Sequence, residues 1–152
     1  MECDVAVLGG GPGGYTAAIR AAQLGATTIC VEKEERLGGT CLRVGCIPTK
    51  AWVQTAFALK EAEETFPKLG VTVGAPELDF ATANSWKDRI VDQLTGGVAS
   101  LFKANGVEWV RGAGRFRDAN TIVVEGGEDV SFKAAIVATG SFPLRPPIDG
   151  ID

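Results

Sequence analysis

Two cysteines separated by four residues are the part of this sequence most able to carry out chemistry. Cys41 and Cys46 enclose Gly45, and Pro48 follows them. A disulfide needs Cα atoms within about 7 Å, whereas residues five apart in an ideal α-helix are roughly 8.7 Å apart. A bridge therefore requires a tighter chain, which Gly45 permits, and Pro48 disfavours a regular helix through this segment. Because a small strained ring is easily reduced and re-formed, the spacing is typical of a redox-active pair.

A zinc site is a poor alternative for these cysteines. The sequence has no second C-x-x-C pair and no histidine, although cysteine and histidine are the usual ligands of structural zinc. We therefore expect no metal site. The other two cysteines, Cys3 and Cys30, lie in apolar stretches and are expected to be buried, unreactive thiols.

A glycine-rich loop at residues 9–14 is suited to holding a phosphate group. Gly9, Gly11 and Gly14 follow the pattern G-x-G-x-x-G. The first glycine allows a tight turn, the second lets the backbone approach a pyrophosphate, and the third lets a helix pack closely on a strand. The N–H groups and the dipole at the helix start then attract the phosphate charge. Glu32 lies 18 residues beyond Gly14, where an acidic residue binds a ribose hydroxyl, although in isolation it could equally be a solvated charge at a strand end.

The elements predicted around this loop have the order strand, helix, strand. Apolar, β-branched residues predict strands at Val5–Leu8 and Thr27–Val31, and an alanine-rich stretch predicts a helix at Tyr15–Leu24. Such a βαβ unit forms a parallel sheet with a right-handed crossover. The loop between strand and helix, with Glu32 after the second strand, therefore predicts an α/β domain that binds a dinucleotide.

Two long helices are predicted next, at about Pro48–Glu64 and about Ala81–Ala104, with a loop rich in proline and glycine between them. The second helix has an apolar stripe, expected to pack in the core, that consists of Trp86, Ile90, Leu94, Val98 and Leu101. Gly96–Gly97 within this helix cost roughly 1 kcal/mol each relative to alanine. We therefore look for a close contact with another segment there.

Short strands are predicted in the rest of the chain, at Val107–Val110, Gly114–Phe116, Thr121–Val124 and Val130–Phe132. Turn residues at 118–120 and 126–127 predict that these strands form an antiparallel meander. A fully apolar strand at Ala135–Ala138 follows. Residues 142–152 contain Pro143, Pro146 and Pro147 and are predicted to be a linker.

Charge and hydropathy exclude several classes of partner. Fifteen lysines and arginines against 19 acidic residues give a net charge of −4, and no basic run stands out, so neither nucleic acid nor a membrane surface is expected as a partner. No stretch approaches the roughly 18 apolar residues of a membrane span. The N-terminus lacks the basic region of a secretory signal, which favours a cytoplasmic protein with reduced thiols.

The residues around the cysteine pair resemble the active-site signature of a known enzyme family. Residues 38–50 (GGTCLRVGCIPTK) are similar to that of the flavin-dependent pyridine nucleotide–disulfide oxidoreductases. Residues 85–97 and 112–116 (GAGRF) resemble dihydrolipoamide dehydrogenases in particular. One departure is Arg43, where the family usually has asparagine. The implied fold is a Rossmann-like FAD-binding domain with a parallel sheet and a three-stranded antiparallel meander.

The resemblance implies specific roles for individual residues. The loop glycines would hold the FAD pyrophosphate, and Glu32 would bind the adenosine ribose. Cys46 would be the charge-transfer thiol beside the flavin, Cys41 the interchange thiol that reacts with substrate, and Lys50 a positive charge near flavin N5. The other residues implied to line the FAD site are Pro12, Lys33, Gly39, Thr40, Ala113, Gly114, Thr139, Gly140 and Ser141.

The implied reaction passes electrons from dihydrolipoamide, carried on a lipoyl domain of a 2-oxoacid dehydrogenase complex, through Cys41–Cys46 and FAD to NAD. Residues 1–141 would be the FAD-binding domain and residues 142–152 a linker toward an NAD-binding domain absent from this sequence, in an enzyme that is a homodimer at full length. Three alternatives stay open. They are a stand-alone FAD-binding electron-transfer module, a related reductase of the glutathione or mercuric type, and a structural interaction domain whose glycine loop binds nothing.

Overall fold

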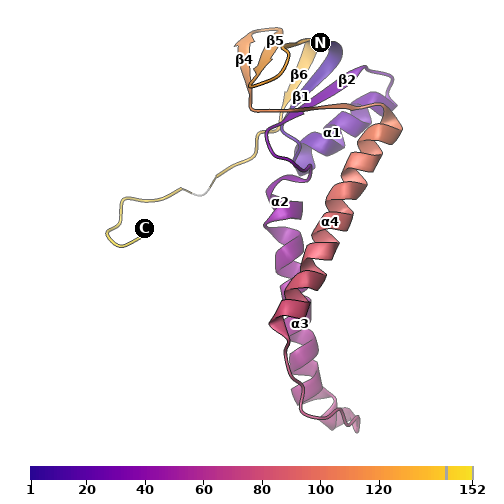
Figure 1. Cartoon of the computed structure of the whole chain (residues 1–152), viewed down its shortest axis with the longest axis vertical. Coiled ribbons are helices and arrows are strands. Elements are labelled where there is room, and N and C mark those ends of the chain that lie inside the picture. Colours follow the sequence, from indigo (N-terminus) through magenta and orange to yellow (C-terminus); the bar gives the residue numbers. More distant parts are fainter. Residues whose placement is uncertain (143, 152) are drawn as a thin grey trace.

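The computed structural model describes residues 1–142 and 144–151, so Pro143 and Asp152 of the predicted linker lie outside the described part. Figure 1 shows a sheet at one end of the molecule, helix α1 against it, and a pair of long helices that project from it. The N-terminus lies at the sheet, and the C-terminal segment extends away from it. The described residues after Val137 form no helix or strand.

Six strands form one sheet in the order β3-β2-β1-β6-β5-β4. Their bounds are β1 Glu2–Leu8, β2 Thr28–Glu32, β3 Glu108–Arg111, β4 Gly114–Asp118, β5 Thr121–Val124 and β6 Val130–Val137. Strand β1 is parallel to β2 and β6, and β3 is parallel to β2, whereas β5 is antiparallel to β4 and β6. The predicted α/β fold, with a parallel sheet and a three-stranded antiparallel segment, is confirmed.

Two details of the predicted strands are wrong. Residues 107–110 do not belong to the meander, because β3 lies parallel to β2, with Trp109 opposite Cys30. A long helical crossover precedes β3, and such a connection returns the chain in the parallel direction. The predicted strands at 130–132 and 135–138 are one strand, β6. The change of pattern that suggested two strands accompanies the end of its pairing with β5, which covers only Val130 and Ser131.

The helices are α1 Pro12–Gln23, α2 Gly39–Arg43, α3 Cys46–Lys60 and α4 Phe80–Asn105, and α3 continues into a π-helical turn at Glu61–Thr65 and a short 3-10 turn at Pro67–Leu69. Helix α1 begins at Pro12, earlier than predicted, because proline suits a first turn whose N–H groups need no partner within the helix. Helix α2 has no counterpart among the predicted helices. None of the described helices is long and apolar enough to cross a membrane.

Core residues lie on both faces of the sheet. On one face, Val7 and Cys30 pack with Ala18 of α1 and with Val98 and Phe102 of α4. The core on the other face, which is closed by the meander, comprises Cys3, Ala6, Leu8, Ile29, Val31, Ile122, Val124, Val130 and Phe132. Cys3 and Cys30 are therefore buried as predicted, and burial raises the pKa of the Cys30 thiol to about 12.

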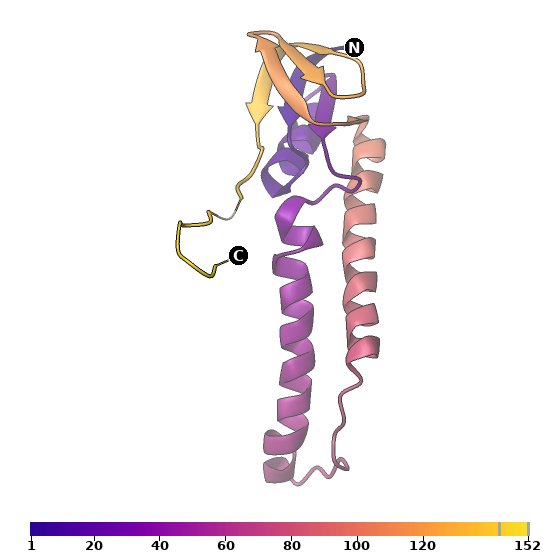
Figure 2. The same cartoon turned by 60° about the vertical axis from the view of Figure 1, so that its left-hand side comes forward.

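The buried side of α4 differs from the predicted stripe. It consists of Val91, Thr95, Val98 and Phe102, and of the predicted stripe only Val98 is buried. The reason is that away from the sheet α4 lies beside α3 alone (Figure 2). Gly96 and Gly97 have no atom within 4 Å of the position that a Cβ would take. No described segment makes the close contact sought there.

Candidate functional site

A cleft of about 870 Å³ opens where the parallel strands β1 and β2 end. Four other segments complete its walls: the glycine loop, the two-cysteine segment Gly39–Cys46, residues 112–114 and residues 138–141. These segments come from distant parts of the sequence. They meet because the carboxyl ends of parallel strands lie at one edge of a sheet, where open α/β folds bind their ligands.

The glycine loop has the geometry that the sequence predicts. Gly9 has a φ of 106°, and its N–H donates to the Val31 carbonyl at 2.8 Å. A Cβ at Gly14 would lie 1.7 Å from the Gly9 carbonyl oxygen, so the third glycine is required for the helix to pack against the loop. Gly11 is the N-cap of α1, and because glycine has no side chain, the N–H groups of the first turn have no side-chain cap. Gly11 and Gly13 line the cleft. Helix α1 thus starts at the cleft wall with no side-chain cap, as an anion site requires.

The carboxylate of Glu32 lies at the end of β2 and is held from two directions. One oxygen accepts a hydrogen bond from the Gly10 N–H at 2.6 Å, and the other accepts one from the Glu34 N–H at 3.0 Å. Glu32 is only 8% exposed, yet it lines the cleft. It is therefore a fixed acceptor with unused lone pairs, not a solvated charge.

The two-cysteine segment packs directly on the glycine loop. A Cβ at Gly39 would lie 2.6 Å from the Cα of Gly11, so only glycine allows this approach. Helix α2 ends at Arg43 and α3 begins at Cys46, and Gly45 breaks the helix between them with a φ of −116° and a ψ of −102°. The two cysteines therefore do not lie in one regular helix.

Cys41 and Cys46 are both reduced, and their thiols lie close enough for Cys46 to act on the pKa of Cys41. The hydrogen bond to Cys46 is the main cause that raises the pKa of Cys41, with partial burial and the charge of Cys46 as further causes. The Cys46 backbone N–H and the charge of Lys50 act in the opposite direction on this pKa. Cys46 therefore makes Cys41 harder to deprotonate, and the charge of Lys50 partly offsets this effect.

The residues predicted to hold the cofactor converge on this one cleft. Those that line it are Gly9, Gly11, Pro12, Glu32, Lys33, Gly39, Thr40, Cys41, Cys46, Ala113, Gly114, Thr139, Gly140 and Ser141. Gly14 does not line it, because it lies beneath the loop against Gly9. Lys50 does not line it either. It is exposed on α3, one turn beyond Cys46 and close enough to act on the pKa of Cys41.

Several cleft residues are missing from the sequence-based set. Glu34 and Arg43 line the cleft and form an ion pair, with Nη2 and Oε2 2.8 Å apart. Glu34 follows β2 whereas Arg43 ends α2, so no local pattern connects them. Gly112 also lines the cleft, with a φ of 147°. The sequence signal that could have identified Gly112 is that Ala113 has a glycine on each side. Among the described residues, no group of three or more cysteine or carboxylate side chains is placed to bind a metal ion.

Comparison with known proteins now places the chain. Residues 3–152 match the family model described as pyridine nucleotide-disulphide oxidoreductase. The chain belongs to this family. It is 47% identical over 144 residues to dihydrolipoyl dehydrogenase 1, mitochondrial, of Arabidopsis thaliana, a match that covers 92% of this chain and 28% of that protein. It is 43% identical over 150 residues to dihydrolipoyl dehydrogenase of Vibrio cholerae, covering 97% of this chain and 31% of that protein.

A solved structure supports the fold. The HOCl-induced flavoprotein disulfide reductase RclA of Escherichia coli matches with a TM-score of 0.79 at 24% sequence identity, over 97% of this chain and 30% of that chain. The chain thus spans about three tenths of the length of the relatives that it matches. The resemblance inferred from the sequence to this enzyme family is confirmed.

Proposed function

We propose that residues 1–141 form the FAD-binding, thiol-carrying domain of a dihydrolipoamide dehydrogenase-like enzyme. The observation that carries the proposal is the position of the thiol pair: Cys41 and Cys46 line the same cleft as the glycine loop and Glu32. A dithiol beside a dinucleotide site is the arrangement that a flavin-dependent disulfide oxidoreductase needs. The dihydrolipoyl dehydrogenase relatives favour dihydrolipoamide over glutathione or mercuric ion as the substrate.

The cleft fits a dinucleotide cofactor. The uncapped start of α1 suits a pyrophosphate, and the fixed carboxylate of Glu32 suits a ribose hydroxyl. Gly39 packs so closely on Gly11 that position 39 has no space for a side chain. Ala113 and Gly114 would border the adenine, and residues 139–141 would close over the cofactor. A bound FAD supplies two-electron redox chemistry between a dithiol and NAD.

The cysteine pair would take part in two thiol–disulfide exchanges. A substrate thiolate attacks the Cys41 sulfur of the oxidised pair, which forms a mixed disulfide and releases Cys46 as a thiolate. The second substrate thiol then attacks the mixed disulfide and releases Cys41, so the substrate leaves as a disulfide and the pair is left reduced. The resemblance of residues 38–50 to the active-site signature of the family supports this division of roles. Lys50 would keep a positive charge near the pair.

The remaining proposals concern the whole protein. NAD would bind outside this chain, and residues 142–152 would be the linker that leads to its domain. The dihydrolipoamide would be presented by a lipoyl domain of a 2-oxoacid dehydrogenase complex, and the enzyme would be a cytoplasmic homodimer. The names of the relatives support the substrate.

The full-length protein that contains this chain provides the test. It should be yellow, contain FAD and reduce NAD with dihydrolipoamide faster than it reduces glutathione disulfide. Cys41→Ser and Cys46→Ser should each lose this activity. On mild reduction, the long-wavelength absorption of a thiolate in contact with flavin should disappear in Cys46→Ser and persist in Cys41→Ser. Cys3→Ala, which alters a buried thiol outside the cleft, is the matched control and should stay active.

Other results of these experiments would indicate a different function. A flavin-free protein would exclude a dinucleotide-dependent oxidoreductase. FAD binding without NAD reduction would indicate an electron-transfer module, and a preference for glutathione disulfide would indicate a related reductase. Absorption that persists in Cys46→Ser and disappears in Cys41→Ser would reverse the roles of the two thiols.

A further inference from the structure

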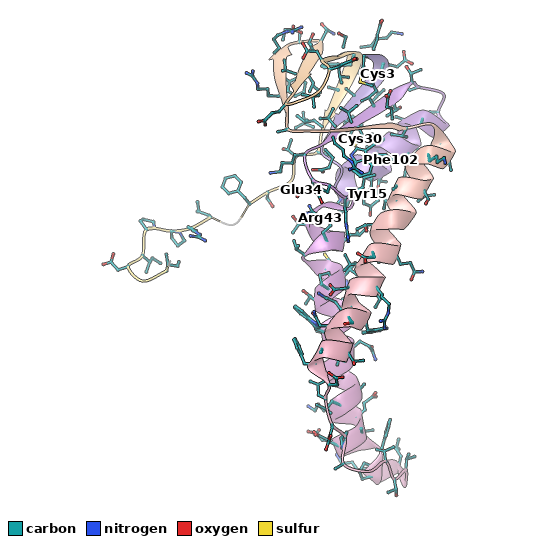
Figure 3. All side chains as sticks on the ribbon, viewed as in Figure 1. Cys3, Tyr15, Cys30, Glu34, Arg43 and Phe102 are labelled. Carbon is teal, nitrogen blue, oxygen red and sulfur yellow. The ribbon has the colours of Figure 1, made fainter. Side chains whose placement is uncertain are left out.

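One ion pair joins two of the segments that form the cleft. Arg43 lies between the two cysteines at the end of α2, and Glu34 follows β2. Their side chains are 27% and 40% exposed, and the Arg43 Nη2 lies 2.8 Å from the Glu34 Oε2. Both residues line the cleft, and Figure 3 shows their side chains next to each other, between the sheet and α2. The pair therefore crosses from the cofactor-binding strand end to the thiol-carrying segment.

This ion pair completes a continuous chain of hydrogen bonds along the cleft wall. The Gly10 N–H donates to the Glu32 carboxylate, which also accepts from the Glu34 N–H. The carboxylate of Glu34 then accepts from Arg43. The glycine loop, the predicted ribose-binding carboxylate and the two-cysteine segment are thus connected in series. Arg43 is the only member of this series that belongs to the two-cysteine segment.

The two-cysteine segment also has attachments other than this ion pair. Leu42 is buried in the core cluster beneath α1 and α4, and Gly39 packs on Gly11. Between these contacts and Cys46, Val44 is 72% exposed. The end of α2 that leads to Cys46 is therefore held by Leu42 on the core side and by the Arg43–Glu34 ion pair on the side of β2.

We propose that the Arg43–Glu34 ion pair is a strap that retains the dinucleotide in the cleft, with Arg43 as a positioning residue. This rests on the proposed function, because it needs a cofactor in the cleft. Glu34 and Arg43 line the cleft from two separate segments, and a bound cofactor would leave more easily if these two segments could move apart. The strap resists that movement.

The test measures FAD release from the full-length holoprotein, by recovery of flavin in the filtrate at fixed times. Arg43→Gln and Glu34→Gln should each speed release by about 2- to 5-fold, as expected for a partly exposed ion pair. The double variant should release FAD no faster than the single variants, and the exchanged pair Glu34→Arg with Arg43→Glu should restore slow release. High salt should speed release from the unaltered protein but not from the variants.

The matched control is Arg117→Gln, which breaks the ion pair between Arg117 Nη1 and Asp129 Oδ2 in the meander, 2.5 Å apart and outside the cleft. It should leave release unchanged, and the apoproteins of all variants should unfold at similar temperatures. Slower FAD release from Glu34→Gln would show that Arg43 acts only as a positive charge toward the cofactor, and would contradict the proposed strap. Unchanged release in both glutamine variants would also overturn it. If the unaltered protein held no FAD, the proposed function itself would fail.

Discussion

The substitution Gly14→Ala tests whether the glycine loop and α1 are packed as closely as the structure indicates. The added Cβ would lie 1.7 Å from the Gly9 carbonyl oxygen and 2.8 Å from its carbon. Ordinary C···O contacts begin near about 3.3 Å, so the loop or the helix must move by roughly 1.6 Å. The Gly9 carbonyl belongs to the backbone, and the backbone also fixes the position of the added Cβ. Neither group can therefore rotate away as the far end of a side chain would.

The expected cost is at the upper end of the range for overpacking, about 3 kcal/mol. For a chain of this size, that corresponds to a fall of about 6–12 °C in the midpoint of thermal unfolding, measured by circular dichroism. The movement would also displace Gly9 and the start of α1, so FAD affinity should fall with stability.

Gly13→Ala is the matched control for this experiment. Its Cβ would find only the Ala138 Cβ, at 3.9 Å, an ordinary contact. This variant should unfold at the temperature of the unaltered chain or up to a few degrees higher, because alanine favours a helix over glycine. Equal unfolding temperatures for the two variants would refute the packing argument, since the structure gives one added methyl group space and the other none.

Three further predictions follow from the structure. Gly97→Ala should stabilise α4 by up to about 1 kcal/mol, because open space surrounds the position; a lower thermal midpoint would reveal an unseen contact. Iodoacetamide should alkylate Cys46 of the reduced chain before Cys41, since Cys46 is exposed and Cys41 has a raised pKa; peptide mass mapping would show the order, and prior labelling of Cys41 would contradict it. The Lys133 ammonium, 2.7 Å from Asp4, holds the pKa of that carboxyl well below its usual range. The resulting stability is present above about pH 4 and is lost as the pH falls toward the lowered pKa of Asp4. Asp4→Asn should therefore make the free energy of unfolding depend less on pH in acid. An unchanged pH dependence below about pH 4 would contradict a stabilising Asp4–Lys133 ion pair.

Local sequence patterns were sufficient to predict the structure where neighbouring residues along the chain determine the backbone geometry. Gly9 and Gly14 meet the steric demands that the G-x-G-x-x-G spacing implies, because a tight turn followed by a helix depends on the backbone of those few residues. The same holds for Gly45, which interrupts the helix between the cysteines. The first βαβ unit was predicted for the same reason, since its strands are continuous apolar runs.

Prediction from pattern was wrong where the neighbours of an element decide its environment. The apolar stripe of α4 is largely exposed because α4 projects beyond the sheet beside a single helix. Strand β3 resembles a meander strand in its residues, yet the preceding helical crossover places it parallel to β2. Burial and strand direction depend on the whole topology, which no window of residues contains.

Residue patterns alone were enough to predict the glycine loop, the pair of cysteines and the class of fold, because each depends on residue types at short, fixed spacings. The folded chain was needed to show that these features share one cleft, that Cys46 raises the pKa of Cys41, and that Arg43 forms an ion pair with Glu34. The physical reason is that side chains from separate loops meet only after the parallel strands align their carboxyl ends at one edge of the sheet.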